Sequence, residues 1–443
     1  MALRTRGIAA ALAVTAALAG LAGCGSGTDA SAEVGACRDY VQYGKHEGSS
    51  VRIMSSIRDL EAANFTRTFR AFEKCTGIKV VWDGKQGFEA DLRKQLEAKA
   101  PPNLAIIAQP GLLQYSVASG QAKPASAQLT TLARAEYSGQ WLDYGTVGDV
   151  FYAAPLGANV KSWVWYSPAM FRRNNWKVPT TWAELKSLTA RIAAEGDVKP
   201  WCAGIESGKA TGWPLTDWIE DVVLRLDGPD VYEDWVEHKI PFTDPRIKAA
   251  FDEVGGILKN RKYTNGGYGD PASIASTPYQ EGGLPILDGE CAMYRMASFY
   301  VNQWPAGTEV ARDGDVYAFY LPSVDGTSRP VLIGGEFVTR FTDDAATQAV
   351  QLYMASPEFA NDRAAQGGWI SPSRGLRLTS VEGKLDEASV ELLRDPAVVV
   401  AFDGSDSMPD AVGAGTFWSE GTEWIKGQST DETVAKIDAS WPR

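Results

Sequence analysis

Histidine is almost missing from this chain of 443 residues, which contains only His46 and His238. Two histidines argue against a multi-histidine metal centre and against a Ser-His-Asp enzyme. The hydrolase motif G-x-S-x-G, the phosphate-binding P-loop and the zinc motif H-E-x-x-H are also absent. Basic residues are outnumbered, with 43 Lys and Arg against 55 Asp and Glu, and they are dispersed. Nucleic-acid binding needs clustered positive charge, so we do not expect it.

Long apolar runs are lacking as well, except over residues 8–22. This run follows two arginines. It is too short to span a bilayer comfortably, but it has the length of a signal-peptide core. It ends in Leu-Ala-Gly-Cys24, which resembles a bacterial lipobox. We therefore expect cleavage of residues 1–23, acylation of Cys24 and a flexible tether over 24–37. An ordinary signal peptide with a chance cysteine is the alternative.

Cysteine is also scarce, with five residues in all. Export would place the chain on the outer face of a bacterial cell membrane, in an oxidising compartment where disulfides persist. If Cys24 is acylated, the remaining four cysteines allow three disulfide connectivities. The C-x₂-C spacing typical of zinc sites is absent, so disulfides are favoured over metal binding. The four are Cys37, Cys75, Cys202 and Cys291.

Strands and helices alternate at the start of the mature chain. Strands are expected over 51–57, 78–82 and 104–108, with one helix in each interval. This order predicts an α/β fold with a parallel sheet flanked by helices. Ligands of open α/β sheets bind beyond the carboxyl ends of the strands. Those ends hold Ser55, Ser56, residues 83–86 and Gln109.

The rest of the chain predicts helices and strands in a less regular order. The chain changes lobe near 152–155 and continues in a strand over 160–166. Further helices are expected over 214–226, 244–260, 343–355 and 413–426, and further strands over 290–296, 316–321 and 331–339.

Tryptophan is abundant, with 15 residues. Three of them, Trp213, Trp369 and Trp418, stand next to glycine-containing loops. A flat apolar ring stacks on the C–H face of a pyranose, and amide or charged side chains take the hydroxyls through directed hydrogen bonds. These tryptophans favour a carbohydrate site, and core packing is the alternative. Acidic pairs such as Glu220-Asp221 could instead serve a glycosidase.

Several longer stretches make the chain similar to a known family. They are FEKCTGIKVVWDG (72–84), PPNLAIIAQPGLL (101–113), ATGWPLTDWIEDVVLR (210–225), YQEGGLPILDGECAMYRMASFY (279–300), GDVYAFYLP (314–322), VLIGGEFV (331–338) and FDGSDSMPDAVGAGTFW (402–418). They resemble the sugar-binding lipoproteins of ABC importers, the maltose-binding-like class, and within it the α-glucoside-binding branch. The resemblance implies a monomer with a two-lobed periplasmic-binding-protein fold of class II and with no cofactor or metal. It would capture an α-glucosidic sugar such as trehalose, maltose or sucrose and deliver it to the membrane permease.

The resemblance also implies how the chain divides. One lobe would combine 38–154 with 338–380, the other 156–333 with 381–443, and hinge crossings would lie near 152–157 and 333–338. The disulfides Cys37–Cys75 and Cys202–Cys291 are then favoured, because each lies within one lobe. Ligand would bind in the cleft, and the lobes would close on it.

The resemblance further implies which side chains reach the ligand. Asp217 would accept hydrogen bonds from sugar hydroxyls and Arg295 would donate to them, while Trp369 and Trp418 would stack. Maltose-binding relatives carry tryptophan at the end of the third strand, where this chain has Gln109, which suggests a smaller or differently oriented ligand than a long maltodextrin. A secreted glycosidase and a receptor of the same fold for a non-sugar solute remain alternatives. The full expected set is Ser55, Ser56, Arg58, Lys85, Gln109, Trp213, Asp217, Arg295, Gly335, Glu336, Trp369 and Trp418.

Overall fold

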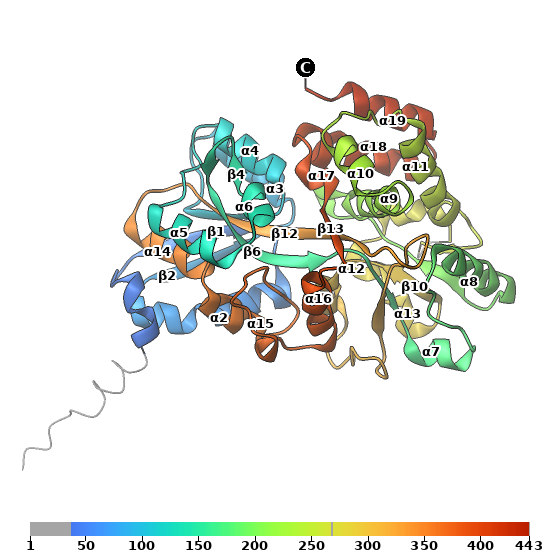
Figure 1. The fold of residues 1–443 in the computed structure, drawn as a ribbon, viewed down its shortest axis with the longest axis horizontal. Helices are drawn as coiled ribbons and strands as arrows, with labels where there is room; N and C mark the ends of the chain where they lie inside the picture. Colours follow the sequence, from blue (N-terminus) through green and yellow to red (C-terminus); the bar gives the residue numbers. More distant parts are fainter. Residues whose placement is uncertain (1–36, 267–268, 443) are drawn as a thin grey trace, which may run out of the picture.

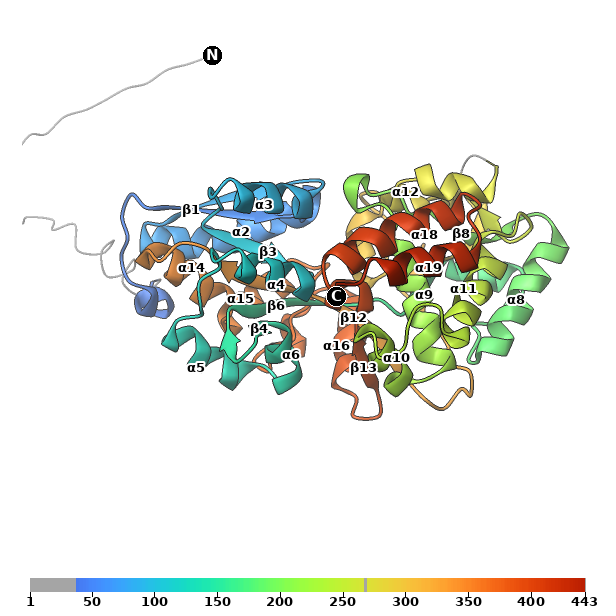
Figure 2. The same cartoon turned by 90° about the horizontal axis from the view of Figure 1, so that it is seen from above.

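The computed structural model describes residues 37–266 and 269–442. These residues form two lobes joined by two long strands (Figure 1), and Figure 2 shows the same two lobes from above. The predicted signal segment 1–23, the acylation site Cys24 and the tether up to residue 36 lie outside the described residues. Within the described ranges, no helix is both long and apolar enough to cross a membrane.

The predicted parallel sheet forms the centre of the first lobe. Strand β1 (Ser50–Ser55) pairs in parallel with β2 (Lys79–Gly84) on one side and with β3 (Leu104–Ile107) on the other. Helix α2 (Asp59–Thr76) packs a row of phenylalanines spaced i, i+4, i+7 against this sheet. The expected α/β class is confirmed. The lobe also contains η1 (Arg38–Tyr43), α3 (Phe88–Glu97), α4 (Pro110–Ala118), α5 (Ala127–Glu136), α6 (Gly139–Tyr144), β4 (Thr146–Val147), β5 (Val150–Phe151), α14 (Ala345–Met354), α15 (Pro357–Ala364) and η5 (Leu378–Ser380).

Two antiparallel strands connect the lobes. Strand β6 (Ala153–Val160) pairs with β12 (Pro330–Arg340) along almost its whole length. The start of β12 pairs with β13 (Val399–Phe402), whereas its end pairs with β3 of the first lobe. Strand β12 thus runs without a break from its partner β13 to its partner β3. We call β12 and the neighbouring β6 the hinge strands.

The second lobe is built on a five-stranded mixed sheet. Its strands lie in the order β11 (Tyr317–Tyr320), β7 (Trp163–Tyr166), β10 (Cys291–Arg295), β8 (Lys199–Cys202) and β9 (Thr264–Asn265). The flanking helices are α7 (Pro168–Arg173), α8 (Trp182–Glu195), η2 (Gly208–Ala210), α9 (Trp213–Leu226), α10 (Pro229–Val236), α11 (Pro245–Leu258), η3 (Pro271–Ser276), α12 (Tyr279–Gly282), α13 (Pro285–Asp288), η4 (Ser298–Gln303), α16 (Lys384–Arg394), α17 (Gly404–Ser407), η6 (Ala411–Phe417), α18 (Trp418–Ile425) and α19 (Thr430–Ala439).

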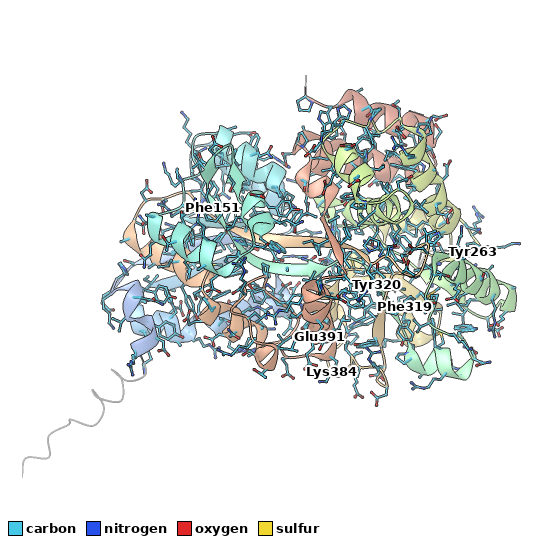
Figure 3. All side chains as sticks on the ribbon, in the orientation of Figure 1. Phe151, Tyr263, Phe319, Tyr320, Lys384 and Glu391 are labelled. Atoms are coloured by element: carbon cyan, nitrogen blue, oxygen red, sulfur yellow. A yellow bond between two sulfur atoms is a disulfide. The ribbon has the colours of Figure 1, made fainter. Side chains whose placement is uncertain are left out.

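The edge strand β11 and helix α16 border a groove on the second lobe. Phe319 and Tyr320 of β11 and Glu391 of α16 contribute to its walls (Figure 3). This groove is separate from the space between the lobes.

Among the described residues, the buried hydrophobic side chains gather in two clusters in the first lobe and one in the second, and contacts continue across the hinge. Leu113 and Ala153 pack with the core of the second lobe, and Val390 packs with that of the first. The lobe boundaries expected at 154–156, 333–338 and 380 therefore stay a prediction.

Two predicted elements differ from the observed ones. The strand expected over 160–166 is interrupted at Lys161 and Ser162, where the chain leaves its partner β12 and joins the second sheet as β7. The helix expected over 413–426 begins as the π-helical turn η6, in which Gly413 approaches the carbonyl of Ser405 so closely that a Cβ would collide. The wider turn places α17 directly against η6.

Both expected disulfides are present, which confirms the predicted pairing. Cys37–Cys75 ties the start of the first lobe to the end of α2, and Cys202–Cys291 links the neighbouring strands β8 and β10. The Cα atoms are 5.3 Å and 5.4 Å apart, within the ordinary range for a disulfide. Each bond lies within one lobe.

We predict that the double substitution Cys202→Ala/Cys291→Ala lowers the free energy of unfolding by about 2–5 kcal/mol. The bond closes a loop with a sequence separation of 89 residues, so its loss enlarges the unfolded ensemble. Urea denaturation followed by circular dichroism measures the change. The Cys37→Ala/Cys75→Ala protein, whose bond spans 38 residues, is the matched comparison and should lose somewhat less. An unchanged midpoint for the first variant would contradict the prediction.

Candidate functional site

A cavity lies between the two lobes, above the hinge strands. It encloses about 1170 Å³, including the part that is open to solvent. The first lobe lines it with residues that follow β1, β2 and β3, which is the carboxyl edge of the parallel sheet. The second lobe lines it with the starts of α9, α12, α17 and α18 and with η4.

The hinge strands form the floor of this cavity. Side chains alternate along a strand, so Gly157 and Asn159 of β6 share one face with Lys161, which directly follows the strand. Glu336 of β12 lies over Gly157, where a Cβ would collide with its carboxylate. Glycine at 157 therefore gives Glu336 its space.

The first lobe supplies a polar wall. Ser56, Arg58 and Glu61 follow β1, Lys85 follows β2, and Gln109 follows β3. Gln109 is 7% exposed, and its Nε2 donates to Oε1 of Glu89 over 3.4 Å. This wall matches the carboxyl-edge position that the sequence predicts.

The second lobe supplies an aromatic wall. Trp213 meets Tyr279 edge-on with ring centroids 4.9 Å apart, and Phe299 lies 5.9 Å from it. Trp418 is buried, and its Nε1 donates to Oγ of Ser405 over 3.3 Å. These rings give the cavity flat apolar faces next to polar groups.

Glycine at position 212 brings two of these aromatic elements together. Its φ of 113° is a conformation that L side chains rarely adopt, and a Cβ there would collide with the carbonyl of Trp418. A larger residue would push the start of α9, with Trp213, away from α18.

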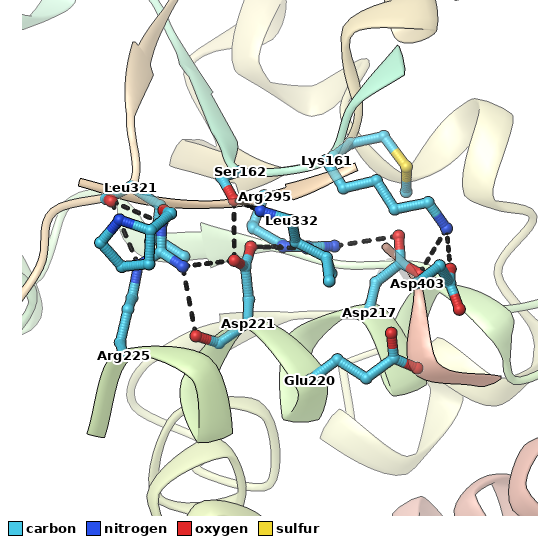
Figure 4. Close-up of polar contacts among 12 residues, drawn as sticks. Lys161, Ser162, Asp217, Glu220, Asp221, Arg225, Arg295, Leu321, Leu332 and Asp403 are labelled. Atoms are coloured by element: carbon cyan, nitrogen blue, oxygen red, sulfur yellow. Dashed lines mark hydrogen bonds and ion pairs between the residues drawn. The ribbon is translucent and has the colours of Figure 1, made fainter. Parts of the chain in front are cut away.

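A buried network of ion pairs lies beneath the cavity (Figure 4). Lys161 Nζ donates to Asp217 Oδ1 over 2.9 Å and also pairs with Asp403. Arg295 Nη1 donates to the other oxygen of Asp217 over 3.1 Å, and its Nη2 donates to Asp221 over 2.7 Å. Arg225 completes the chain by pairing with Asp221.

Burial and neighbouring charges act on these carboxyls in different directions. Burial raises the pKa of Asp217 to about 6, against the pull of Lys161 and Arg295. Although burial also acts on Asp221, the guanidinium groups of Arg225 and Arg295 hold its pKa below the usual value. Burial and the Asp403 carboxylate raise the pKa of Asp406, which faces the cavity, well above its usual range.

Three acidic side chains at this network have carboxylate oxygens that lie close enough together to suggest a metal site. Oxygens of Asp217, Glu220 and Asp403 lie within 4.8 Å of one another. The ammonium of Lys161, however, is bonded to two of these three carboxylates. The arrangement therefore fits a lysine counter-ion.

Comparison with known proteins agrees with this geometry. Residues 58–365 match the family model of the bacterial extracellular solute-binding proteins. The chain belongs to this family. It is thus the extracellular binding component of an ABC importer, and its relatives are binding proteins.

Two curated relatives span nearly the whole binding protein. The osmoprotective compounds-binding protein GgtB of Synechocystis sp. is 34% identical over 411 residues, which cover 92% of this chain and 96% of the relative. The alpha-glucosides-binding periplasmic protein AglE of Rhizobium meliloti is 32% identical over 407 residues, covering 89% and 87%.

Solved structures share the fold at much lower identity. The bacterial solute receptor AcbH aligns with a TM-score of 0.74 at 17% identity, covering 88% of this chain and 97% of its own. RafE of Streptococcus pneumoniae aligns with a TM-score of 0.65 at 16% identity, covering 90% and 98%. The two-lobed fold expected for the binding protein is confirmed.

The cavity brings together eight of the twelve expected ligand contacts. They are Ser56, Arg58, Lys85, Gln109, Trp213, Gly335, Glu336 and Trp418. Contact of these residues with a ligand stays a prediction.

Four expected residues lie outside the cavity lining. The Ser55 hydroxyl accepts the N–H of Ile57 and faces inward. Asp217 and Arg295 are fully buried and bind each other, because α9 turns its inner face to the second sheet rather than to the cleft. Trp369 packs in the first lobe against Phe65, with ring centroids 5.9 Å apart. Direct ligand contact by these four is not supported by their position.

Sequence reasoning predicted Glu336 but missed the other acidic residues of the cavity and Lys161. The missed acidic residues are Asp59, Glu61, Glu89, Asp403 and Asp406. Asp403 and Asp406 stand within the quoted FDGSDS stretch at the end of a strand, so the carboxyl-edge rule could have found them. Glu61 and Glu89 lie in the first turns of α2 and α3, where an acidic residue is ordinary for a helix start.

We predict that Lys161→Met destabilises the binding protein by about 3–5 kcal/mol at pH 8, because it leaves buried carboxylates without their cation. The folded-state pKa of Asp217, which burial already raises to about 6, should then rise further, and that of Asp403, which Lys161 holds below its usual value, should rise above it. The defect should accordingly shrink as the pH falls to 5, where these carboxyls take up protons. Urea unfolding at both pH values measures it. Lys186→Met, which removes an exposed partner of Glu253, should cost less than about 1 kcal/mol, and a pH-independent defect in Lys161→Met would refute the explanation.

Proposed function

We propose that the binding protein captures an α-glucosidic sugar in the cavity between its lobes and delivers it to the permease of its importer. The observation that carries this proposal is the pairing, in one cavity, of two tryptophans with charged and amide groups. Trp213 and Trp418 lie across from Lys85, Gln109 and other polar side chains of the first lobe.

Physical chemistry supports a sugar in such a cavity. Aromatic faces take the C–H surface of a pyranose, and hydroxyl groups need directed partners that both donate and accept. The two relatives with more than 30% identity are named for osmoprotective compounds and for alpha-glucosides. Small α-glucosides such as trehalose, sucrose and maltose are therefore the ligands we propose.

Closure of the lobes would hold the sugar. Arg93 of α3 in the first lobe forms a two-pronged ion pair with Asp410 of the second, in which Nε donates to Oδ2 over 2.6 Å. Gly208 lies beside Gln86 across the same opening. Both contacts join the first lobe to the second, and their separation would open the cavity by rotation about the hinge strands.

Binding without chemistry is the activity that we propose. The acidic network beneath the cavity is occupied by Lys161, Arg295 and Arg225, so its carboxylates serve as counter-ions. A monomer anchored to the membrane through Cys24 fits this role, because a tethered receptor stays close to its permease.

Isothermal titration calorimetry with trehalose, maltose and sucrose tests the proposal. We predict binding in the micromolar range or tighter, together with a change in tryptophan fluorescence. Trp418→Ala should weaken it at least about 30-fold, which corresponds to about 2 kcal/mol of lost stacking and burial. Trp441→Ala is the control, since Trp441 stacks on His238 and is not among the residues that line the cavity. Equal affinities for the two variants would remove Trp418 from the site, and no binding of any of the three sugars would overturn the proposal.

The lipid anchor is tested by Cys24→Ser in the full chain, expressed in a bacterium that processes lipoproteins. We predict that the wild-type protein sediments with membranes and partitions into the detergent phase, because an acyl chain supplies apolar surface. The variant should lose this partitioning. Ala22→Ser serves as a control that keeps the cysteine. Detergent partitioning of Cys24→Ser equal to that of the wild type would rule out acylation at this residue.

A further inference from the structure

The cavity is lined by more carboxyl groups than cationic side chains. Six carboxylates line it, against three cationic side chains. Two of the cations already have partners, because Lys161 is held by Asp217 and Asp403, and Lys85 lies 3.5 Å from Asp83. A neutral sugar would give the unpaired carboxyl groups no counter-charge when they ionise. The carboxylates are Asp59, Glu61, Glu89, Glu336, Asp403 and Asp406.

The positive charge of Arg363 acts on the carboxyl groups of Glu61 and Glu336 without bonding to either. Among the described residues, no ion pair joins either carboxylate to a basic side chain. The guanidinium of Arg363 lies behind them, over the rings of Phe65 and Trp369 at 4.7 Å and 5.4 Å. Its Nη1 donates to a backbone carbonyl, and its Nε and Nη2 donate to no group.

Buried hydrogen-bond acceptors in the cavity are also unpaired. Gln109 Oε1 and Asn159 Oδ1 have no hydrogen-bond partner, although these residues are only 7% and 9% exposed. The orientation of the Gln109 amide is set by its bond to Glu89, which leaves the oxygen as the free atom. A buried acceptor without a donor is costly. The two amide oxygens therefore indicate a ligand that brings donors to the cavity floor and the adjoining wall.

We propose that the ligand is an α-glucoside carrying a protonated primary amine, with its ammonium group between Glu61 and Glu336 and its hydroxyls donating to Gln109 and Asn159. This inference rests on the proposed function and names its ligand class. An ammonium offers three donors and no acceptor, as an acceptor-rich floor requires. The aromatic wall adds faces that attract a cation.

Titration of the same groups agrees with this arrangement. Burial raises the pKa of Glu61 to about 8 and that of Glu336 to about 7. The charged groups that face them are Arg363 on α15, which lowers both pKa values, and Asp386 on α16, whose own pKa burial raises to about 7. Arg58 and Asp59 lie at the start of α2 on the cavity side. Ionised carboxylates bind a cation, so affinity for the amine should rise from pH 6 to pH 8, whereas affinity for a neutral sugar should not.

The test is calorimetry with matched ligands at pH 6 and pH 8. The probes are trehalose, maltose and sucrose, their 6-amino-6-deoxy derivatives, and the N-acetylated forms of those amines. An aliphatic amine of this kind stays largely protonated at pH 8, and acetylation removes its charge. We expect at least one amine to bind ten times more tightly than both its neutral parent and its N-acetyl form, with the difference larger at pH 8.

Each other outcome has a definite meaning. Neutral sugars that bind as tightly as every amine would overturn this inference and leave the proposed function intact. An advantage of the amine that is lost at pH 8 would also overturn it. Failure of all probes to bind would remove the proposed function, and the inference with it.

Substitutions of Glu61 and Glu336 test whether these two carboxylates bind the ammonium group. Glu336→Gln and Glu61→Gln should each weaken binding of the amine at least tenfold and change binding of the neutral parent less than threefold. Glu253→Gln, on the surface beside Lys186, is the control and should change neither. Equal losses for both ligands would show that the carboxylates serve hydrogen bonding alone and would contradict the proposal. Should one variant fail to fold, the other and the wild-type pH comparison decide.

Discussion

The buried ammonium of Lys161 is the interaction on which the site depends. Lys161 follows the last residue of β6, Asp403 follows the last residue of β13, and Asp217 lies in the first turns of α9. One cation thus joins a hinge strand, a second strand and the helix that begins with Trp213. Its charge is needed because it lies between two buried carboxylates, Asp217 and Asp403. The floor and the aromatic wall of the cavity hold their relative positions through this contact.

Most of the fold could be predicted from the sequence, because the residue patterns that indicate helices and strands are local. The alternating apolar runs before residue 108 predicted the parallel sheet, and the carboxyl-edge rule placed Ser56, Lys85 and Gln109 at the cavity. The π-helical turn at 411–417 and the break at Lys161 were not predicted, since both depend on which distant segment the chain meets. Gly413 lies against the carbonyl of Ser405, and the Ser162 hydroxyl accepts the N–H of Leu332 in β12.

The cavity residues could be predicted only in part, because side-chain orientation also depends on distant segments of the chain. The sequence shows that Asp217 and Arg295 are polar residues in apolar surroundings, and such residues either face a ligand or pair with each other. The decision depends on the rotation of α9, which turns Asp217 toward Arg295 and leaves Trp213 at the cavity. The carboxylates Glu61 and Glu336 come from a helix start and a hinge strand, and only the folded chain brings them together.

The position of the two disulfides has a consequence for motion. Cys37–Cys75 and Cys202–Cys291 each begin and end within one lobe, so neither forms a covalent strap across the opening. The bonds stiffen two bodies and leave the axis between them unrestrained. Oxidation on export would then increase the stability of each lobe. The amplitude of opening is set by the pair of hinge strands and by contacts that form and break without any change in covalent structure.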